Sequence, residues 1–157
     1  MQKMNRLTLL IALFYGLNIL IVFPLLFILL NTYFSLPVYS FNMLKYLGVI
    51  FLLIGTISWF HCVILFISSG KGTPVPTDPP KNLVTKGIYK YTRNPMYLSV
   101  LVILFGYFLL FGHLLLLIYP IIAFLFFHLF ITLYEEPILR KKFGQDYIRY
   151  CQKIPRW

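Results

Sequence analysis

The stretch YKYTRNPMYLSV, residues 89–100, marks where a cationic, tyrosine-rich segment gives way to an apolar one. Asparagine is among the best caps of a helix N-terminus, and proline is favoured at the first helical position. Proline also disfavours helical geometry in the residue before it. We therefore expect a helix to begin at Pro95, with Asn94 as its cap and Arg93 just outside it.

Apolar residues dominate the rest of the chain. Of 157 residues, 60% are hydrophobic, whereas soluble domains contain roughly 45–50%. Four apolar runs, 7–30, 46–69, 95–111 and 114–134, approach the roughly 17–25 residues that a membrane-spanning helix needs. They lack the alternation of barrel strands. The sequence predicts an all-α integral membrane protein, a single domain over 1–157 with four transmembrane helices.

The net charge of +10 is unevenly placed. Cations precede the first run and fill the 70–94 loop and the 135–157 tail, whereas the 31–42 connection has none. The positive-inside rule puts both termini in the cytoplasm. We attribute the cations to anionic lipid rather than to nucleic acid, and the scattered histidines and cysteines predict no metal site.

The tail after Gly144 predicts a short amphipathic helix, with Tyr147, Tyr150 and Ile154 on one face. Such a helix lies on a membrane surface. It could also cover a pocket on the cytosolic side.

Opposite charges are predicted to meet at the cytosolic edge. The first amides of the 95–111 helix lack helical partners, and Arg93 beside them makes this a candidate anion site. Glu135 and Glu136 return to the same edge, where a helix C-terminus favours cations. Facing anion and cation sites suit a zwitterion such as an amino acid head group.

Simpler interpretations stay open for both sites. A lipid phosphate could occupy the helix start. One of the two glutamates could instead form a salt bridge with Arg93, Lys90 or Arg140.

A predicted substrate pocket continues from the glutamates into the membrane. His128 and Thr132 lie seven and three residues before Glu135, which predicts one shared helix face. Phe124 and Ile131 complete a mostly apolar lining that suits a lipid chain entering from the inner leaflet. His128 could equally be an interhelical hydrogen-bonding residue.

Two segments carry a family resemblance. GTPVPTDPPKNLVTKGIYKYTRNPMYLS, residues 72–99, and EEPILRKKFGQDYIRYCQKIPRW, residues 135–157, resemble the isoprenylcysteine carboxyl methyltransferases and their phospholipid methyltransferase relatives. The resemblance implies an integral membrane methyltransferase that uses S-adenosyl-L-methionine. Because relatives with Arg-Asn-Pro look bacterial, we expect a bacterial or archaeal inner membrane.

The resemblance also implies the site residues. Those expected to bind the cofactor are Lys81, Asn82, Leu83, Val84, Tyr89, Asn94, Pro95, Met96, Tyr97 and Glu135. The isoprenylcysteine enzymes have histidine at the positions of Lys81 and Asn94, and an arginine that meets the substrate at the position of Ile131. The acceptor is therefore left open between an isoprenylcysteine carboxylate and a phospholipid amine.

The catalytic candidates are Arg93, Glu136 and His128. An amine acceptor must lose a proton, which Glu136 or His128 could accept. Two other functions compete with the methyltransferase. One is an NADPH-dependent membrane reductase of the steroid-reductase type, and the other is a small lipid-binding membrane protein without catalysis.

Overall fold

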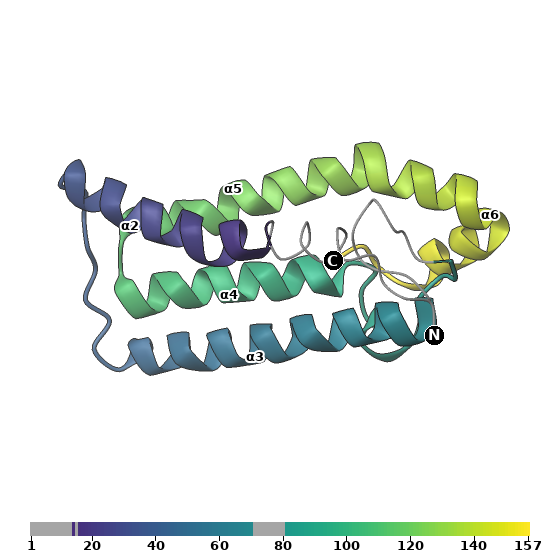
Figure 1. Ribbon diagram of the computed structural model, residues 1–157, viewed down its shortest axis with the longest axis horizontal. Coiled ribbons are helices and arrows are strands. Elements are labelled where there is room, and N and C mark those ends of the chain that lie inside the picture. The colour runs from purple at the N-terminus through teal and green to yellow at the C-terminus, as the bar shows by residue number, and fades with distance from the viewer. Residues whose placement is uncertain (1–13, 15, 71–80) are drawn as a thin grey trace.

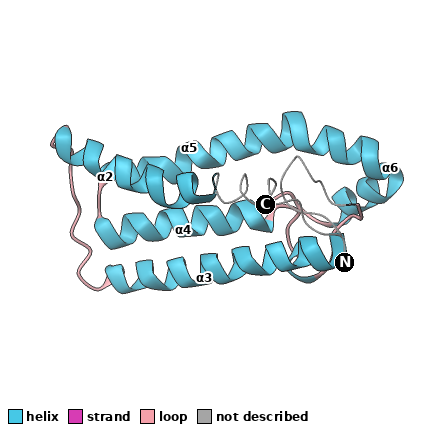
Figure 2. Ribbon diagram, in the orientation of Figure 1, coloured by secondary structure: helices cyan, strands magenta, loops and turns pink. Residues whose placement is uncertain are grey.

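The computed structural model describes residues 14, 16–70 and 81–157, and every named element in them is a helix. Its α-helices are α2 (Phe23–Tyr33), α3 (Leu44–Leu65), α4 (Pro95–Phe111), α5 (Leu114–Phe130) and α6 (Glu136–Lys153). Three π-helical turns, η1 (Asn18–Val22), η2 (Phe66–Gly70) and η4 (Ile131–Glu135), continue these helices, and η3 (Gly87–Lys90) is a 3-10 turn. Helices α2 to α5 lie alongside one another (Figures 1 and 2).

The helix bounds confirm the predicted all-helical class. The predicted 95–111 helix is α4 itself, and the 46–69 run corresponds to 44–70. Two continuous helices, Leu44–Gly70 and Leu114–Lys153, are long and apolar enough to cross a membrane. The described parts of the other two runs form shorter apolar helices, so four spans stay a prediction. Residues 7–13 and 15 of the first run lie outside the described residues.

The predicted short helix after Gly144 is confirmed as the second half of α6. A first helical half, which was not predicted, precedes it: α6 begins at Glu136, directly after η4, and its two halves are separated by the non-helical backbone of Gly144, where φ is 53°. Glycine adopts positive φ without the steric cost of a side chain. The helix therefore turns at this residue, and its second half folds back toward the start of α4 (Figure 1).

The contact between α3 and α4 depends on glycines. A Cβ atom on Gly48 would lie 2.9 Å from the carbonyl oxygen of Gly106, and one on Gly55 would lie 2.6 Å from Cγ1 of Ile103. Small residues allow membrane helices to approach closely. This contact positions α4, which supplies much of the candidate site.

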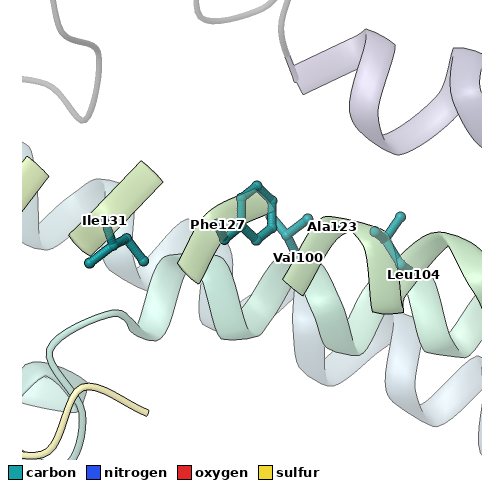
Figure 3. Close-up of a cluster of buried hydrophobic side chains, with 5 residues drawn as sticks. All are labelled: Val100, Leu104, Ala123, Phe127 and Ile131. Carbon is teal, nitrogen blue, oxygen red and sulfur yellow. The ribbon is translucent and has the colours of Figure 1, made fainter. Parts of the chain in front are cut away.

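Helices α4 and α5 share an apolar core. Val100 and Leu104 of α4 pack with Ala123 and Phe127 of α5 and with Ile131 of η4 (Figure 3). All five are buried. This core fixes the register of the two helices that meet at the site.

The opposite end of the bundle is closed by hydrogen bonds around Asn31, which is fully buried. Its Nδ2 donates to the carbonyl of Leu36 at 3.0 Å, and its Oδ1 accepts from the amide of Leu115 at 3.1 Å. The amide of Tyr39 donates to the carbonyl of Gly112 at 2.8 Å. These bonds tie the connection between α2 and α3 to the turn between α4 and α5.

Candidate cofactor and substrate site

Two neighbouring rows of side chains run along α5 into η4 and the start of α6, each with a spacing of four residues. One row, on the α4 side, comprises Ala123, Phe127, Ile131 and Glu135. The other comprises Phe124, His128, Thr132 and Glu136, of which all but Thr132 contact the C-terminal residues Arg156 and Trp157. His128 and Glu136 contact the C-terminal residues whereas Glu135 contacts Tyr97, so these contacts do not support the predicted face shared by His128, Thr132 and Glu135.

Glu135 is bound to α4 through Tyr97. The Tyr97 hydroxyl donates to Oε2 of Glu135 at 2.7 Å. No ion pair to Glu135 is present among the described residues. Burial raises the pKa of the Glu135 carboxyl; the Tyr97 hydrogen bond opposes this rise, and the nearby charge of Glu136 adds to it. A cation bound to Glu135 would therefore offset the free-energy cost of burying its charged carboxylate.

Glu136 has the opposite environment. Its Oε1 accepts from Arg93 at 3.0 Å and from Nε of Arg156 at 2.8 Å, and its Oε2 accepts from Arg156 at 3.1 Å. Arg140 stands 3.9 Å away on the exposed side. Burial alone would raise the pKa of Glu136, but the Arg156 hydrogen bond and the three positive charges outweigh it, so the pKa lies below its ordinary value.

These contacts argue against two predicted roles. Both oxygens of Glu136 are engaged by arginine, so this carboxylate is not available to take a proton from a substrate. The guanidinium of Arg93 is paired with Glu136 and also donates to Sγ of Cys151 at 2.8 Å, so it is not a separate anion site. The alternative salt bridge from one of the glutamates to Arg93 is the arrangement found.

The C-terminal segment 155–157 connects the parts of the site. The amide of Arg93 donates to the carbonyl of Pro155 at 3.0 Å. The carbonyl of Arg156 accepts from Oγ1 of Thr92 at 2.9 Å and from Nδ2 of Asn94 at 3.0 Å. The residues just before α4 and the start of α6 are therefore held together by one short stretch of chain.

The predicted side-chain cap of α4 is wrong in its detail. Asn94 is the N-cap residue, but its amide group binds the carbonyl of Arg156 rather than the helix. Proline at the first helical position is confirmed. In the described chain no hydrogen bond is found from the amides of Met96 and Tyr97, as expected at a helix start. Tyr97, whose hydroxyl binds Glu135, belongs to this first turn of α4.

The loop before α4 packs on the end of α3. Val84 and Tyr89 are buried with Cys62. This packing explains why the otherwise polar loop contains the apolar residues of NLVT, residues 82–85. Burial, and next the Cys62 thiol and the Glu135 carboxylate, raise the pKa of Tyr89, which places its hydroxyl in the electrostatic field of Glu135. Its carbonyl accepts from the Tyr150 hydroxyl at 2.6 Å.

The remaining loop residues of the predicted set stand at the end of η2. The amides of Lys81 and Asn82 donate to the carbonyl of Gly70 at 2.8 and 3.1 Å. Leu83 is half-buried. Residues 71–80 of this loop lie outside the described residues.

The predicted substrate residues divide into two groups. Ile131 is buried in the α4–α5 core, so it does not line a free surface. Phe124 and His128 contact the Trp157 ring, with centroid distances of 5.1 and 6.3 Å. Thr132 is half-buried, and its Oγ1 is buried without a hydrogen-bond partner in the described chain.

Sequence reasoning missed the residues that assemble this site from the far end of the chain. These are Cys151, Arg156 and Trp157, which contact Arg93, Glu136 and His128. The sequence signals were that 135–157 belongs with 72–99 in one family pattern and that an amphipathic tail helix could cover a cytosolic pocket. Periodicity could not find Arg156 and Trp157, because the segment 154–157 is not helical.

The fold and this site define a class of protein: a helical membrane protein whose polar groups gather where the helices end. The phospholipid methyltransferase family model matches residues 44–146. The chain belongs to this family, so it is a member of a family of membrane methyltransferases that act on lipids. Comparison with curated proteins gave no match, and neither did comparison with solved structures.

Proposed function

We propose that the protein is a membrane methyltransferase that uses S-adenosyl-L-methionine and acts on a lipid acceptor from the inner leaflet. One observation carries the proposal. In a member of a methyltransferase family, Glu135 has a neutral hydrogen-bond donor, Tyr97, as its partner, and Tyr97 belongs to the first turn of α4, where the amides of Met96 and Tyr97 are unpaired in the described chain. A half-buried carboxylate and a helix N-terminus suit the ammonium and carboxylate of the methionine part of this cofactor.

The residues present fit that cofactor. Glu135 would accept from its ammonium, and the amides of Met96 and Tyr97 would donate to its carboxylate. Tyr89 and Tyr97 present aromatic rings, which attract cations such as a sulfonium. The bound cofactor supplies an electrophilic methyl group. The loop residues Lys81, Asn82, Leu83 and Val84, together with Asn94 and Pro95, would form the rest of the enclosure.

A phospholipid amine is the acceptor that we favour. The family matched is the phospholipid methyltransferase family. The isoprenylcysteine enzymes have a substrate-binding arginine at the position of Ile131. Here that position is apolar and buried against α4, so it offers no group to bind a substrate carboxylate. Because arginines hold Glu136, we propose that the amine loses its proton to water and that the protein aligns donor and acceptor.

The membrane arrangement belongs to the same proposal. Four spans, with both termini and the 70–94 loop in the cytoplasm of a bacterium or archaeon, put Glu135 at the cytosolic surface. A lipid acceptor of the inner leaflet would then reach the site from the side. The short connections at the other end of the bundle offer no comparable polar site among the described residues.

Glu135→Gln tests the proposal. The loss of a charge-assisted hydrogen bond should weaken S-adenosyl-L-methionine binding by about 1.5–3 kcal/mol, or roughly 10- to 150-fold. Isothermal calorimetry in detergent measures this, with Asp146→Asn, an exposed acid, as the matched control. Unchanged affinity in a folded Glu135→Gln protein would remove Glu135 from the site. Binding of NADPH instead of S-adenosyl-L-methionine would favour the reductase.

A further inference from the structure

His128 is held in a single orientation by Trp157. The indole Nε1–H donates to Nδ1 of His128 at 3.2 Å, and the two rings lie 25° from parallel. Trp157 also packs on Phe124, and its neighbour Arg156 is fixed by Glu136. The partner of His128 is therefore itself anchored at several points.

This contact sets the position of the imidazole proton. Tryptophan is a donor only, so Nδ1 must be the unprotonated nitrogen that accepts. A neutral imidazole then carries its proton on Nε2, which becomes a hydrogen-bond donor. Nε2 has no hydrogen-bond partner recorded in the described part of the chain.

A second polar atom lies about one helical turn from His128. Thr132 follows His128 by four residues in the same row, and its Oγ1 is buried without a partner among the described residues. Buried hydroxyl groups are nearly always hydrogen-bonded, and exceptions point to a water or a ligand. His128 and Thr132 thus present an imidazole N–H and a hydroxyl that the protein does not satisfy.

We infer that His128 and Thr132 form a subsite for an oxygen atom of the phospholipid head group, with Trp157 as the positioning residue that fixes the His128 tautomer. The inference rests on the proposed function. With a rise of 1.5 Å per residue, Thr132 lies about 4–5 Å and His128 about 10 Å deeper than Glu135 along the helix. The phosphate and ester oxygens of a phospholipid also lie deeper in the membrane than its amine.

Nitrogen NMR of the histidine-labelled full chain tests the tautomer without any assay of activity. The chain has three histidines, so His128→Gln identifies the His128 signals by their loss. We expect the neutral Nε2–H tautomer in the wild type and a mixture of tautomers in Trp157→Phe. An Nδ1–H tautomer, or identical His128 signals in Trp157→Phe, would overturn the role of Trp157.

Ligand binding is tested in a maltoside detergent, which contains no phosphate. Short-chain phosphatidylethanolamine should shift the His128 Nε2–H signal, and Thr132→Val should raise the lipid concentration needed by about three- to tenfold. Thr56→Val, at an exposed position of α3, is the matched control and should leave this concentration unchanged. Diacylglycerol with the same chains has the ester oxygens but no phosphate, so it distinguishes a phosphate ligand from an ester ligand.

The outcomes are distinct. A shift with phosphatidylethanolamine alone assigns the phosphate, and a shift with both lipids assigns the ester carbonyl. No shift with either lipid overturns the subsite, even if the protein methylates phospholipid. A shift in a protein that neither binds S-adenosyl-L-methionine nor transfers methyl groups supports the subsite and rejects the proposed function.

Discussion

Glu135 and Glu136 are adjacent in the chain but face different surroundings. Glu135 points to α4, where the Tyr97 hydroxyl is its hydrogen-bond donor. Glu136 points to the C-terminal segment, where arginines engage both of its oxygens. Successive residues of a helix are about 100° apart, so neighbours reach different partners. We therefore assign Glu136 to structure, and the proposed ligand-binding role falls to Glu135.

Glu136→Gln should destabilise the protein strongly. Removal of one member of a buried ion pair leaves an uncompensated charge, which costs about 3–5 kcal/mol. Thermal unfolding in detergent should show a clear drop in Tm. Arg140→Gln is the matched control and should change the Tm little, because that pair is exposed and 3.9 Å apart. Equal Tm values for both variants would contradict the structural role of Glu136.

The contribution of Glu136 should depend on pH in a defined direction. Its folded-state pKa lies below the unfolded value of about 4.3, so its stabilisation is fully present above that pH. It is lost as the pH falls through the folded-state pKa. The Tm gap between wild type and Glu136→Gln should stay constant from about pH 8 to about pH 5 and shrink below about pH 4. A gap that widens on acidification would contradict this sign.

At the scale of elements, the close contact between α3 and α4 is made by small residues rather than large ones. Gly48 faces Gly106, and Gly55 faces the backbone at Ser99. Lipid chains are as apolar as leucine, so close packing rather than hydrophobic burial must hold these helices together. The position of Tyr97 at the site therefore depends on glycines in the neighbouring helix.

Gly55→Ala should weaken this helix pair. The added Cβ would meet Ile103 Cγ1 at 2.6 Å and the carbonyl oxygen of Ser99 at 2.9 Å, and the second contact cannot be relieved by a rotamer change. Overpacking of this kind costs about 1–3 kcal/mol. Gly16→Ala is the control, since nothing lies within 4 Å of the added atom. A lower Tm for Gly55→Ala alone supports the close contact, and equal values contradict it.

For the whole molecule, one end is organised by backbone contacts and the other by charge. Asn31 and the Tyr39–Gly112 bond close the end at which the 31–42 connection carries no charge. Arg93, Glu136 and Arg156 join three segments at the charged end. This asymmetry agrees with the charge pattern along the chain, which predicts that the charged end faces the cytoplasm.

Cysteine labelling tests that orientation. In a background without Cys62 and Cys151, a cysteine at Ser40 should react with a membrane-impermeant maleimide added to intact cells. A cysteine at Gln145 should react only after the membrane is opened, and both positions are exposed in the structure. Labelling of Gln145→Cys alone in intact cells would reverse the orientation, and labelling of both positions would contradict the odd number of spans predicted between them.

The sequence by itself determined the helical class and the start of α4. Length and apolarity are local properties, and Asn94-Pro95 acts through the backbone geometry of its own residues, so both can be read from a single stretch. Motif resemblance also pointed to the methyltransferase family that the family model shows. The end of the fourth span was less predictable, because η4 continues α5 into α6 without a break.

Only the tertiary structure decided which glutamate pairs with the arginines and which with Tyr97. The sequence treats Glu135 and Glu136 alike, and their partners Tyr97 and Arg156 lie 38 and 20 residues away along the chain. It also could not show that Trp157 reaches His128, since no periodicity relates a non-helical end to a helix face. Pairings between distant segments depend on how helices pack and bend, here at Gly144, and packing is set by the whole chain at once.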